Sequence, residues 1–212
     1  MTDFELRTLK VGFLATNCYI LRKRDNGATV VIDPGADGTY IKSVLREMDA
    51  RLKLILLTHG HFDHILGLAE LRREGVVTAI HEKDAKNLTE RDMFSSMLEN
   101  DPRPFAPAEI LFTEDKNYSI SGFDFYVMNT PGHTPGSVCY VFDDLMFTGD
   151  TLFCGGIGRT DFSGGSDADM DKSLERLVKL PGDFAIYPGH DESGVLSDEK
   201  KYNPYLAKYK KT

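Results

Sequence analysis

The sequence of 212 residues contains no tryptophan, only three cysteines and no long hydrophobic run. A helix needs about 18 consecutive apolar residues to cross a bilayer, so we expect no membrane-spanning segment. The first five residues form neither a basic nor an apolar stretch, and we therefore expect no signal peptide. Cys18, Cys139 and Cys154 are too few and too scattered for a disulfide framework. Their odd number indicates reduced thiols and predicts a cytoplasmic protein.

Basic residues are also in deficit, because 25 Lys and Arg stand against 33 Asp and Glu, for a net charge of −8. Such a chain is a poor electrostatic match for nucleic acid or an anionic membrane, and we expect it to bind neither. Its 41% hydrophobic and 27% charged residues are typical of a globular protein. The length and the absence of a linker predict one domain over residues 1–212.

Short apolar runs alternate with segments of helical spacing. We expect strands over residues 17–21, 29–32, 54–57, 76–80, 123–128, 138–142, 145–147 and 184–187. We expect helices over residues 41–48, 66–71, 82–100, 169–180 and 198–210, with Asp167 or Asp169 as an N-cap and Pro204 as an interruption. The glycine-rich residues 155–165 predict a loop. Because this pattern occurs before residue 80 and again after residue 120, two packed sheets with helices outside would accommodate it.

Histidine placement carries the functional signal. Three of the six histidines lie in the run Thr58-His59-Gly60-His61-Phe62-Asp63-His64, directly after a predicted buried strand. His59 and His61 are two residues apart and can point to one side of an extended segment, whereas Asp63 and His64 begin a helix and can point to a neighbouring position. One segment can therefore supply ligands to two adjacent metal ions.

Three more ligand-type residues follow predicted strands, each in a turn that contains glycine: His133, Asp150 and His190. Neither packing nor solvation explains the same pattern at four strand ends. Imidazole and carboxylate ligands predict two divalent metal ions, with zinc as first choice and iron or manganese as alternatives. His81 lacks such a context, and we interpret it as structural.

The motif HxHxDH, followed in order by a later histidine, an aspartate and a last histidine, resembles the metallo-β-lactamase superfamily. The resemblance implies an α/β (α+β) fold, a four-layer αββα sandwich with metals at one edge. It also implies that one metal is held by three histidines and the other by an aspartate and two histidines, with one bridging carboxylate. In this sequence the residues would be His59, His61 and His133 for the first metal, Asp63, His64 and His190 for the second, and Asp150 as the bridge.

Within the superfamily, the sequence is similar to glyoxalase II, the hydroxyacylglutathione hydrolases, and most of all to a short single-domain branch. The similarity is carried by residues 58–64 and 130–137, and by Gly158-Arg159 with Asp161-Phe162. Longer enzymes of this family carry a C-terminal helical domain that binds glutathione. Here about 22 residues follow His190, too few for such a domain, so the sequence does not define which thiol carrier is used.

The expected chemistry is hydrolysis of a small thioester. Two metal ions can share a water, lower its pKa and polarise the substrate carbonyl, and the bridging hydroxide would attack. Asp63 and Asp150 are the catalytic candidates, since Asp63 can orient the nucleophile and Asp150 can bridge the metals. A thiolate needs little protonation when it leaves, so no further acid is required.

Other residues are candidates for supporting roles. Phe153, Cys154 and Arg159 could line the mouth of the site, with Arg159 binding either a substrate carboxylate or a surface partner. Asp33, Thr58 and Thr148 could orient ligand histidines or cap the backbone. An apolar lid or a packing helix within residues 82–107 would use Met93, Phe94, Met97, Leu98 and Phe105.

We therefore expect a cytoplasmic dinuclear metal hydrolase with a small-molecule thioester substrate, either a monomer or a homodimer. Persulfide dioxygenases share much of the motif but use one iron held by two histidines and one aspartate, and they are the main alternative. Lactone hydrolysis, phosphodiester hydrolysis and a non-catalytic scaffold that keeps the ligands are the others.

Overall fold

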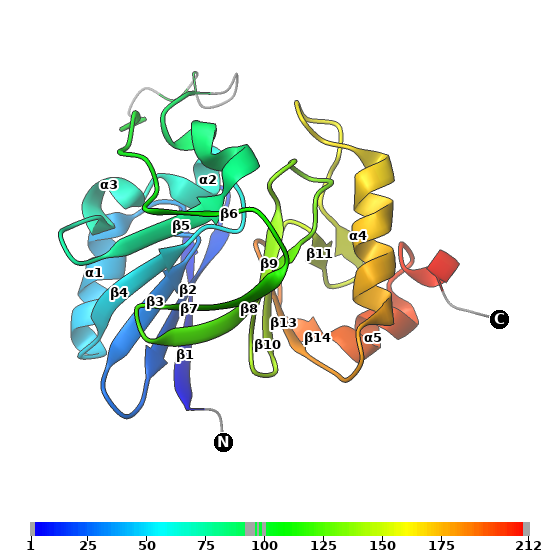
Figure 1. The fold of residues 1–212 in the computed structure, drawn as a ribbon, viewed down its shortest axis with the longest axis horizontal. Coiled ribbons are helices and arrows are strands. Elements are labelled where there is room, and N and C mark those ends of the chain that lie inside the picture. The colour runs from blue at the N-terminus through cyan, green and yellow to red at the C-terminus, as the bar shows by residue number, and fades with distance from the viewer. Residues whose placement is uncertain (1–2, 92–95, 97, 99–100, 210–212) are drawn as a thin grey trace.

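Two six-stranded sheets pack face to face at the centre of the computed structural model, which describes residues 3–91, 96, 98 and 101–209 (Figure 1). The first sheet has the order β1-β2-β3-β4-β5-β6. Its strands β1, β2 and β3 are antiparallel neighbours, and β3 to β6 run parallel. Their bounds are Phe4–Val11, Thr16–Lys23, Ala28–Ile32, Arg51–Leu56, Val77–His81 and Ile110–Phe112.

The second sheet has the order β14-β13-β10-β9-β8-β7. Its strands β7 to β14, apart from β11 and β12, have the bounds Lys116–Ile120, Phe123–Asn129, Val138–Phe142, Leu145–Gly149, Ala185–Pro188 and Gly194–Val195. A separate hairpin joins β11 (Leu152–Phe153) to β12 (Gly156–Ile157). Because β10 and β13 are parallel, the residues that follow them emerge at the same edge of the sheet.

Alternation along the strands explains the layers. Val30 and Ile32 of β3 point into the core between the sheets, whereas Val31 points to the outer face. Both faces are apolar because both are covered, as expected for a strand with parallel neighbours. The inner core holds packed aromatic rings, among them Phe142 and Phe147, which meet edge to face.

Helices cover both outer faces (Figure 1). On the first sheet lie α1 (Gly38–Glu47) and α3 (Leu68–Leu71), and on the second lie α4 (Asp167–Lys179) and α5 (Leu196–Tyr202). The short helices α2 (Phe62–Ile65) and η1 (Glu82–Leu88) lie at the upper edge of the first sheet, and η3 (Ala207–Tyr209) follows α5. The expected four-layer αββα sandwich is thus confirmed. No helix of the described ranges is long and apolar enough to cross a membrane.

One helix prediction is wrong in part. Of the helix expected over residues 82–100, the structure shows a short 3-10 helix that ends at Leu88, and residues 92–95, 97, 99 and 100 lie outside the described residues. Arg103 donates to the carbonyls of Asn87 and Glu90, so a side chain occupies acceptors that a continuing helix would use. The helix expected over residues 198–210 is interrupted at Pro204, as expected: α5 ends at Tyr202, because Asn203 is extended before the proline, and η3 follows over Ala207–Tyr209.

The N-cap of α4 is also not the expected aspartate. Ser166 precedes the helix in an extended conformation, and its hydroxyl accepts a hydrogen bond from the backbone N–H of Asp169. Asp167 and Asp169 lie in the first helical turn, where their charge favours the helix dipole. In the glycine-rich loop, β11 and β12 form a hairpin that sequence spacing did not indicate.

Candidate metal centre

The segment with three histidines runs from the end of β4 into the four-residue helix α2. His61 is the extended residue before the helix, and Asp63 and His64 lie in its first turn. The neighbouring turn at Gly35 packs directly on this helix, since a Cβ atom at Gly35 would lie 1.6 Å from the carbonyl oxygen of Asp63. Glycine is therefore required there for α2 to take its position against the sheet.

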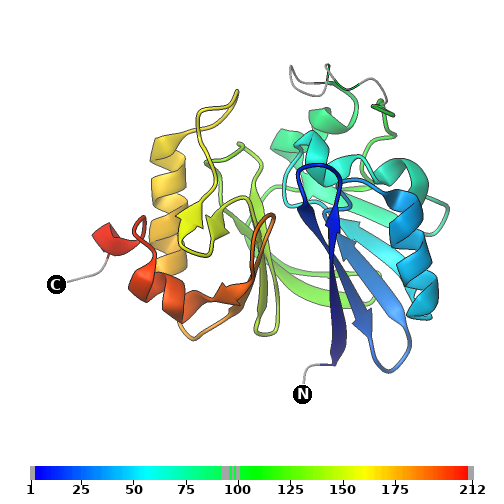
Figure 2. The ribbon, with the colours of Figure 1, turned by 180° about the vertical axis from the view of Figure 1, so that it is seen from behind.

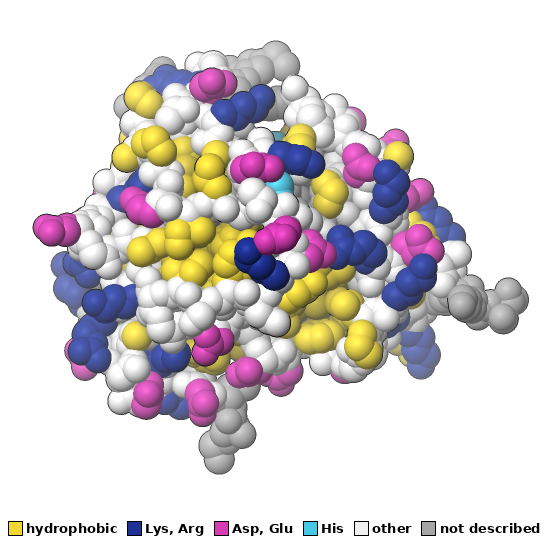
Figure 3. Space-filling view, in the orientation of Figure 1, with side chains coloured by type: hydrophobic (Ala, Val, Ile, Leu, Met, Phe, Trp, Pro, Cys, Tyr) yellow, Lys and Arg dark blue, Asp and Glu magenta, His cyan; other side chains and the backbone are white. Residues whose placement is uncertain are grey.

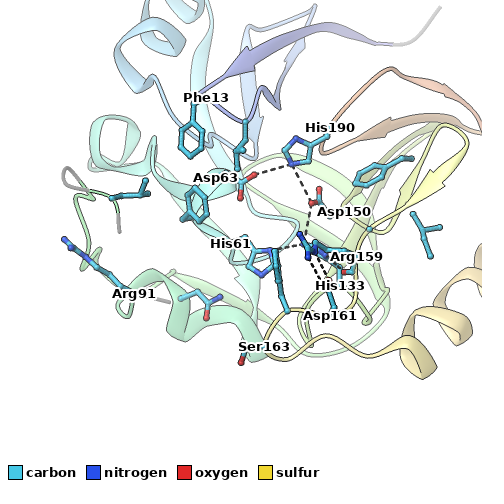
Figure 4. Close-up of a pocket in the computed structure, with 18 of the residues that line it drawn as sticks. Phe13, His61, Asp63, Arg91, His133, Asp150, Arg159, Asp161, Ser163 and His190 are labelled. Carbon is cyan, nitrogen blue, oxygen red and sulfur yellow. Dashed lines mark hydrogen bonds and ion pairs between the residues drawn. The ribbon is translucent and has the colours of Figure 1, made fainter. Parts of the chain in front are cut away.

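Three histidines bring their ring nitrogens to one point. The Nδ1 atom of His61 lies 3.1 Å from Nε2 of His59 and 2.8 Å from Nε2 of His133. His59 and His61 come from the end of β4, whereas His133 follows β8 in the other sheet. The edge at which the two sheets meet thus assembles this three-histidine group. Figure 4 shows two of its members, His61 and His133, side by side.

A second group lies beside it, and Asp150 connects the two. Oδ2 of Asp63 is 3.2 Å from Nε2 of His190 and 3.5 Å from Nε2 of His64. Oδ1 of Asp150 is 3.5 Å from Nε2 of His64, and its Oδ2 is 3.4 Å from Nε2 of His133. The structure therefore brings together all seven residues expected as ligands. Asp63, His64 and His190 form the second group, named here the carboxylate group, and Asp150 lies between it and the three-histidine group.

The outer nitrogen of three histidines is held by a hydrogen bond. Nδ1 of His59 lies 3.1 Å from the hydroxyl of Thr58, Nδ1 of His64 lies 2.9 Å from Oδ2 of Asp33, and Nδ1 of His133 lies 2.7 Å from the carbonyl oxygen of Arg159. A donating Nδ1–H leaves the Nε2 lone pair facing the centre, which is the tautomer a metal requires.

Asp33 also receives the backbone N–H and the hydroxyl of Thr58, at 2.7 and 2.6 Å. Its carboxylate thereby supports His64 directly and His59 through Thr58. Thr148 does not take part, since its hydroxyl donates to the carbonyl of Leu152 and caps the turn after β10.

The residues fit divalent metal ions. Nε2 of His64 and Oδ1 of Asp150 are buried and have no hydrogen-bond partner within the described part of the chain. Buried polar atoms are normally satisfied, so two such atoms that face each other indicate a missing partner. In the three-histidine group, neutral nitrogens that face one another at 2.8 and 3.1 Å present lone pairs that a cation would satisfy.

The three-histidine group and the carboxylate group differ in the pKa values of their histidines. Burial lowers the pKa of His61 to about 4, and the neighbouring His133 adds to the effect. Burial would also lower the pKa of His64, but Asp63, Asp150 and Asp33 surround it and raise its pKa to about 10. The carboxylate group thus favours a positive charge at its centre, whereas burial keeps His61 of the three-histidine group neutral.

The metal centre lies in a pocket of about 1380 Å³. In the space-filling view, a small histidine patch reaches the surface beside acidic and basic side chains (Figure 3). The hairpin between β1 and β2 reaches this edge and places Phe13 and Leu14 in the wall, where Phe13 stacks on Phe62 (Figure 2). Phe13 is 76% exposed, which is unusual for a large apolar side chain and places it within reach of a ligand.

The expected substrate contacts divide three ways. Phe153 lines the pocket, with its ring 6.3 Å from that of His190. Arg159 also lines it, but its guanidinium forms a bidentate pair with Asp161 and lies over the ring of Phe162. Cys154 does not belong to the lining among the described residues, because its thiol turns to the carbonyl of Glu192 and packs against Gly194. A substrate contact from Cys154 is therefore not supported.

The predicted lid is only partly visible. Leu98 lines the pocket, whereas Phe105 packs against the core of the first sheet, so the two have different roles. Met93, Phe94 and Met97 lie outside the described residues. His81 is structural, as interpreted, since its Nδ1 accepts the backbone N–H of Lys83 at the start of η1.

Sequence reasoning missed residues that act from the start of β2. Thr16 donates to Oδ2 of Asp63 at 3.1 Å. Asn17 donates to the carbonyls of Pro188 and Asp191, which lie on either side of the loop with His190. These partners are 47 and more than 170 positions apart along the chain, and no local spacing could connect them.

Fold and ligand pattern define the class: the chain belongs to the metallo-β-lactamase superfamily, whose family model matches residues 11–190. It is 35% identical over 205 residues to "Probable metallo-hydrolase YqgX" of Bacillus subtilis, covering 94% of this chain and 96% of that protein. It is 34% identical over 213 residues to "Hydroxyacylglutathione hydrolase GloC" of Haemophilus influenzae, covering 95% and 97%.

Solved structures agree with this assignment. The BLEG-1 B3 metallo-β-lactamase superposes with a TM-score of 0.87 at 32% identity, covering 96% of this chain and 100% of that one. TTHA1623, solved in a di-iron-bound form, superposes with a TM-score of 0.82 at 28% identity, covering 94% and 100%. These similarities establish the fold and family, and they leave the metal and the substrate to be argued from the site.

Proposed function

We propose that the protein is a metal-dependent hydrolase that cleaves a small thioester of the hydroxyacylglutathione type, using two divalent metal ions. The observation that carries the proposal is the pair of ligand groups that meet at Asp150 on the floor of the pocket. His59, His61 and His133 would hold one ion, and Asp63, His64 and His190 the other, with Asp150 shared. Zinc is our first choice, and the similarity to a di-iron protein keeps iron as an alternative.

When bound, such ions would polarise the substrate carbonyl and acidify a water. The chain's own residues supply orientation. Asp63, held by Thr16, lies at the pocket surface, and its carboxylate can accept a hydrogen bond from the attacking water. Because a thiolate can leave without protonation, the site needs no further general acid.

The pocket walls support an elongated, negatively charged substrate. Phe13, Phe62 and Phe153 offer apolar contact and exclude water near the metals. Lys86 and Arg91 lie in the wall with η1 and the segment after it, where they could meet carboxylates of a thiol carrier such as glutathione. Figure 4 shows Phe13 and Arg91 on the side of the pocket away from Asp161.

The same pocket favours a small molecule as partner. The net charge of −8 supports this, and we propose that neither nucleic acid nor a membrane surface is bound. We also propose that the protein acts in the cytoplasm, as a monomer or a homodimer.

The carboxylate group favours a hydrolase with two metal ions over an oxygenase with one iron. His64 is fully buried, and Asp33 holds it with Nε2 toward Asp63 and Asp150. These contacts hold a second set of ligands beside the three-histidine group, and this supports two ions rather than one.

The test is metal content per chain, measured together with S-lactoylglutathione hydrolysis on the same sample. We expect two metals and turnover, with turnover lost in His190→Ala and in Asp150→Ala. One iron, no thioester turnover and oxygen uptake with glutathione persulfide would overturn the proposal. Hydrolysis of a chromogenic cephalosporin in place of the thioester would keep the metal centre and move the substrate to the β-lactams of the structural relative.

A further inference from the structure

Asp84 is a buried carboxylate outside both ligand groups. It lies in η1, only 2% exposed, and its side chain accepts three hydrogen bonds. Oδ2 receives the backbone N–H of Gly60 at 2.9 Å and the hydroxyl of Thr134 at 2.7 Å, and Oδ1 receives the backbone N–H of Gly136 at 2.9 Å. A Cβ atom at Gly136 would lie 2.5 Å from Oδ1, so the two loops close tightly around this carboxylate.

The residues that bond to Asp84 flank the three-histidine group. Gly60 separates His59 from His61, and Thr134 directly follows His133. One loop leaves the first sheet and the other leaves the second, so a single carboxylate joins the backbones that bring the three nitrogens together. Asp33, by contrast, supports His64 and, through Thr58, His59.

We infer that Asp84 is a positioning residue of the metal centre, whose buried carboxylate fixes the separation between the loop of His59 and His61 and the loop of His133. It touches neither ligand side chain nor pocket and acts through the backbone. The inference rests on the proposed function in one respect, namely that the three-histidine group binds a metal ion.

Replacement by asparagine breaks this arrangement in a defined way. An amide has one acceptor oxygen, and its NH2 group can only donate. Whichever way the amide turns, the NH2 group faces either the N–H of Gly60 or the N–H of Gly136, and that backbone donor loses its acceptor. The two loops then move apart, and the three nitrogens lose their common focus.

The experiment measures Zn²⁺ affinity of metal-free protein by competition with a chromophoric chelator, in two single-group backgrounds. His190→Ala leaves the three-histidine group, and His61→Ala leaves the carboxylate group. We expect Asp84→Asn to weaken Zn²⁺ binding about ten- to a hundredfold in the His190→Ala background. In the His61→Ala background we expect a change of less than about threefold, since Asp33 supports that group.

Two further variants serve as controls. Thr134→Val, which removes one of the three donors, should weaken binding in the same background by a smaller factor, whereas Thr134→Ser should retain it; this pair decides the matter if Asp84→Asn does not fold. Asp183 also accepts two backbone N–H groups, but it precedes β13 while His190 follows that strand. Asp183→Asn should leave Zn²⁺ affinity unchanged in both backgrounds.

Equal losses in the two backgrounds would assign Asp84 to general folding and overturn the inference. So would unchanged affinity in a folded Asp84→Asn protein. A parent protein that binds no Zn²⁺ would instead overturn the proposed function, and the two failures are thereby distinguishable.

Discussion

Asp150 lies between the two ligand groups, which differ in charge and in support. In the three-histidine group, burial keeps the pKa of His61 near 4. The carboxylate group surrounds His64 with three aspartates, which raise its pKa to about 10. The difference teaches that the first group is ready for a metal at neutral pH, whereas the second must exchange a proton for it.

The largest effect is expected at Asp150, because this residue lies against both ligand groups. Asp150→Asn keeps the shape but removes the charge and turns an NH2 group toward the ring nitrogen of His64 or of His133. We expect metal content to fall at both groups and thioester turnover to drop by at least about a hundredfold. His61→Ala and His190→Ala should each cost one metal. If Asp150→Asn also loses only one metal, the carboxylate belongs to one group and does not bridge.

Glycine 189 offers a test of how tightly the shared residue is held. A Cβ atom there would lie 2.1 Å from Oδ1 of Asp150 and 2.7 Å from Cε1 of His64. Gly189→Ala should displace both side chains and lower turnover about ten- to a hundredfold, with the larger metal loss at the carboxylate group.

The matched control is Gly156→Ala, where the nearest atom would be 3.7 Å away, at ordinary contact distance. It should leave metal content and turnover unchanged. Full activity in Gly189→Ala would contradict the position assigned to Asp150.

Proton release sharpens the comparison further. Below its pKa of about 10, His64 holds a proton in the metal-free protein, and rising pH removes this competitor. In the His61→Ala background, Zn²⁺ affinity should therefore rise about tenfold per pH unit between pH 6 and 8, with about one proton released. In the His190→Ala background, affinity should depend much less on pH over the same window, because burial lowers the pKa values of His59 and His61 below it. Calorimetry in buffers of different ionisation enthalpy counts the protons, and equal slopes would refute the distinction.

Local patterns predicted the parts of the site that are local. The strand ends before His133, Asp150 and His190 each combine an apolar run with a glycine turn, and the sheet topology brings such ends to one edge. The spacing from His59 to His64 is also local: His59 and His61 lie before the helix, and Asp63 and His64 lie in its first turn, so the two pairs point to neighbouring positions.

Contacts between distant segments could not be predicted. Asp84 lies in a segment whose pattern indicates only an irregular helix, and its partners are 24 to 52 positions away. The strand β7 was missed because its exposed, polar residues carry no apolar run. The wall with Phe13 depends on a hairpin that folds back toward the site, which no periodicity encodes.

The smallest effect is expected at Arg159, which supports His133 through its backbone and faces the pocket with its side chain. Arg159→Ala keeps the carbonyl that holds Nδ1 of His133, so Zn²⁺ affinity and kcat should not change. The exposed pair with Asp161 leaves the guanidinium only partly available, and its loss should raise KM for an anionic thioester about two- to fivefold. Asp161→Asn frees the guanidinium and should lower KM instead. Steady-state kinetics on both variants decides the matter: a fall in kcat or in metal content for Arg159→Ala would mean that the side chain, and not the backbone, supports the three-histidine group.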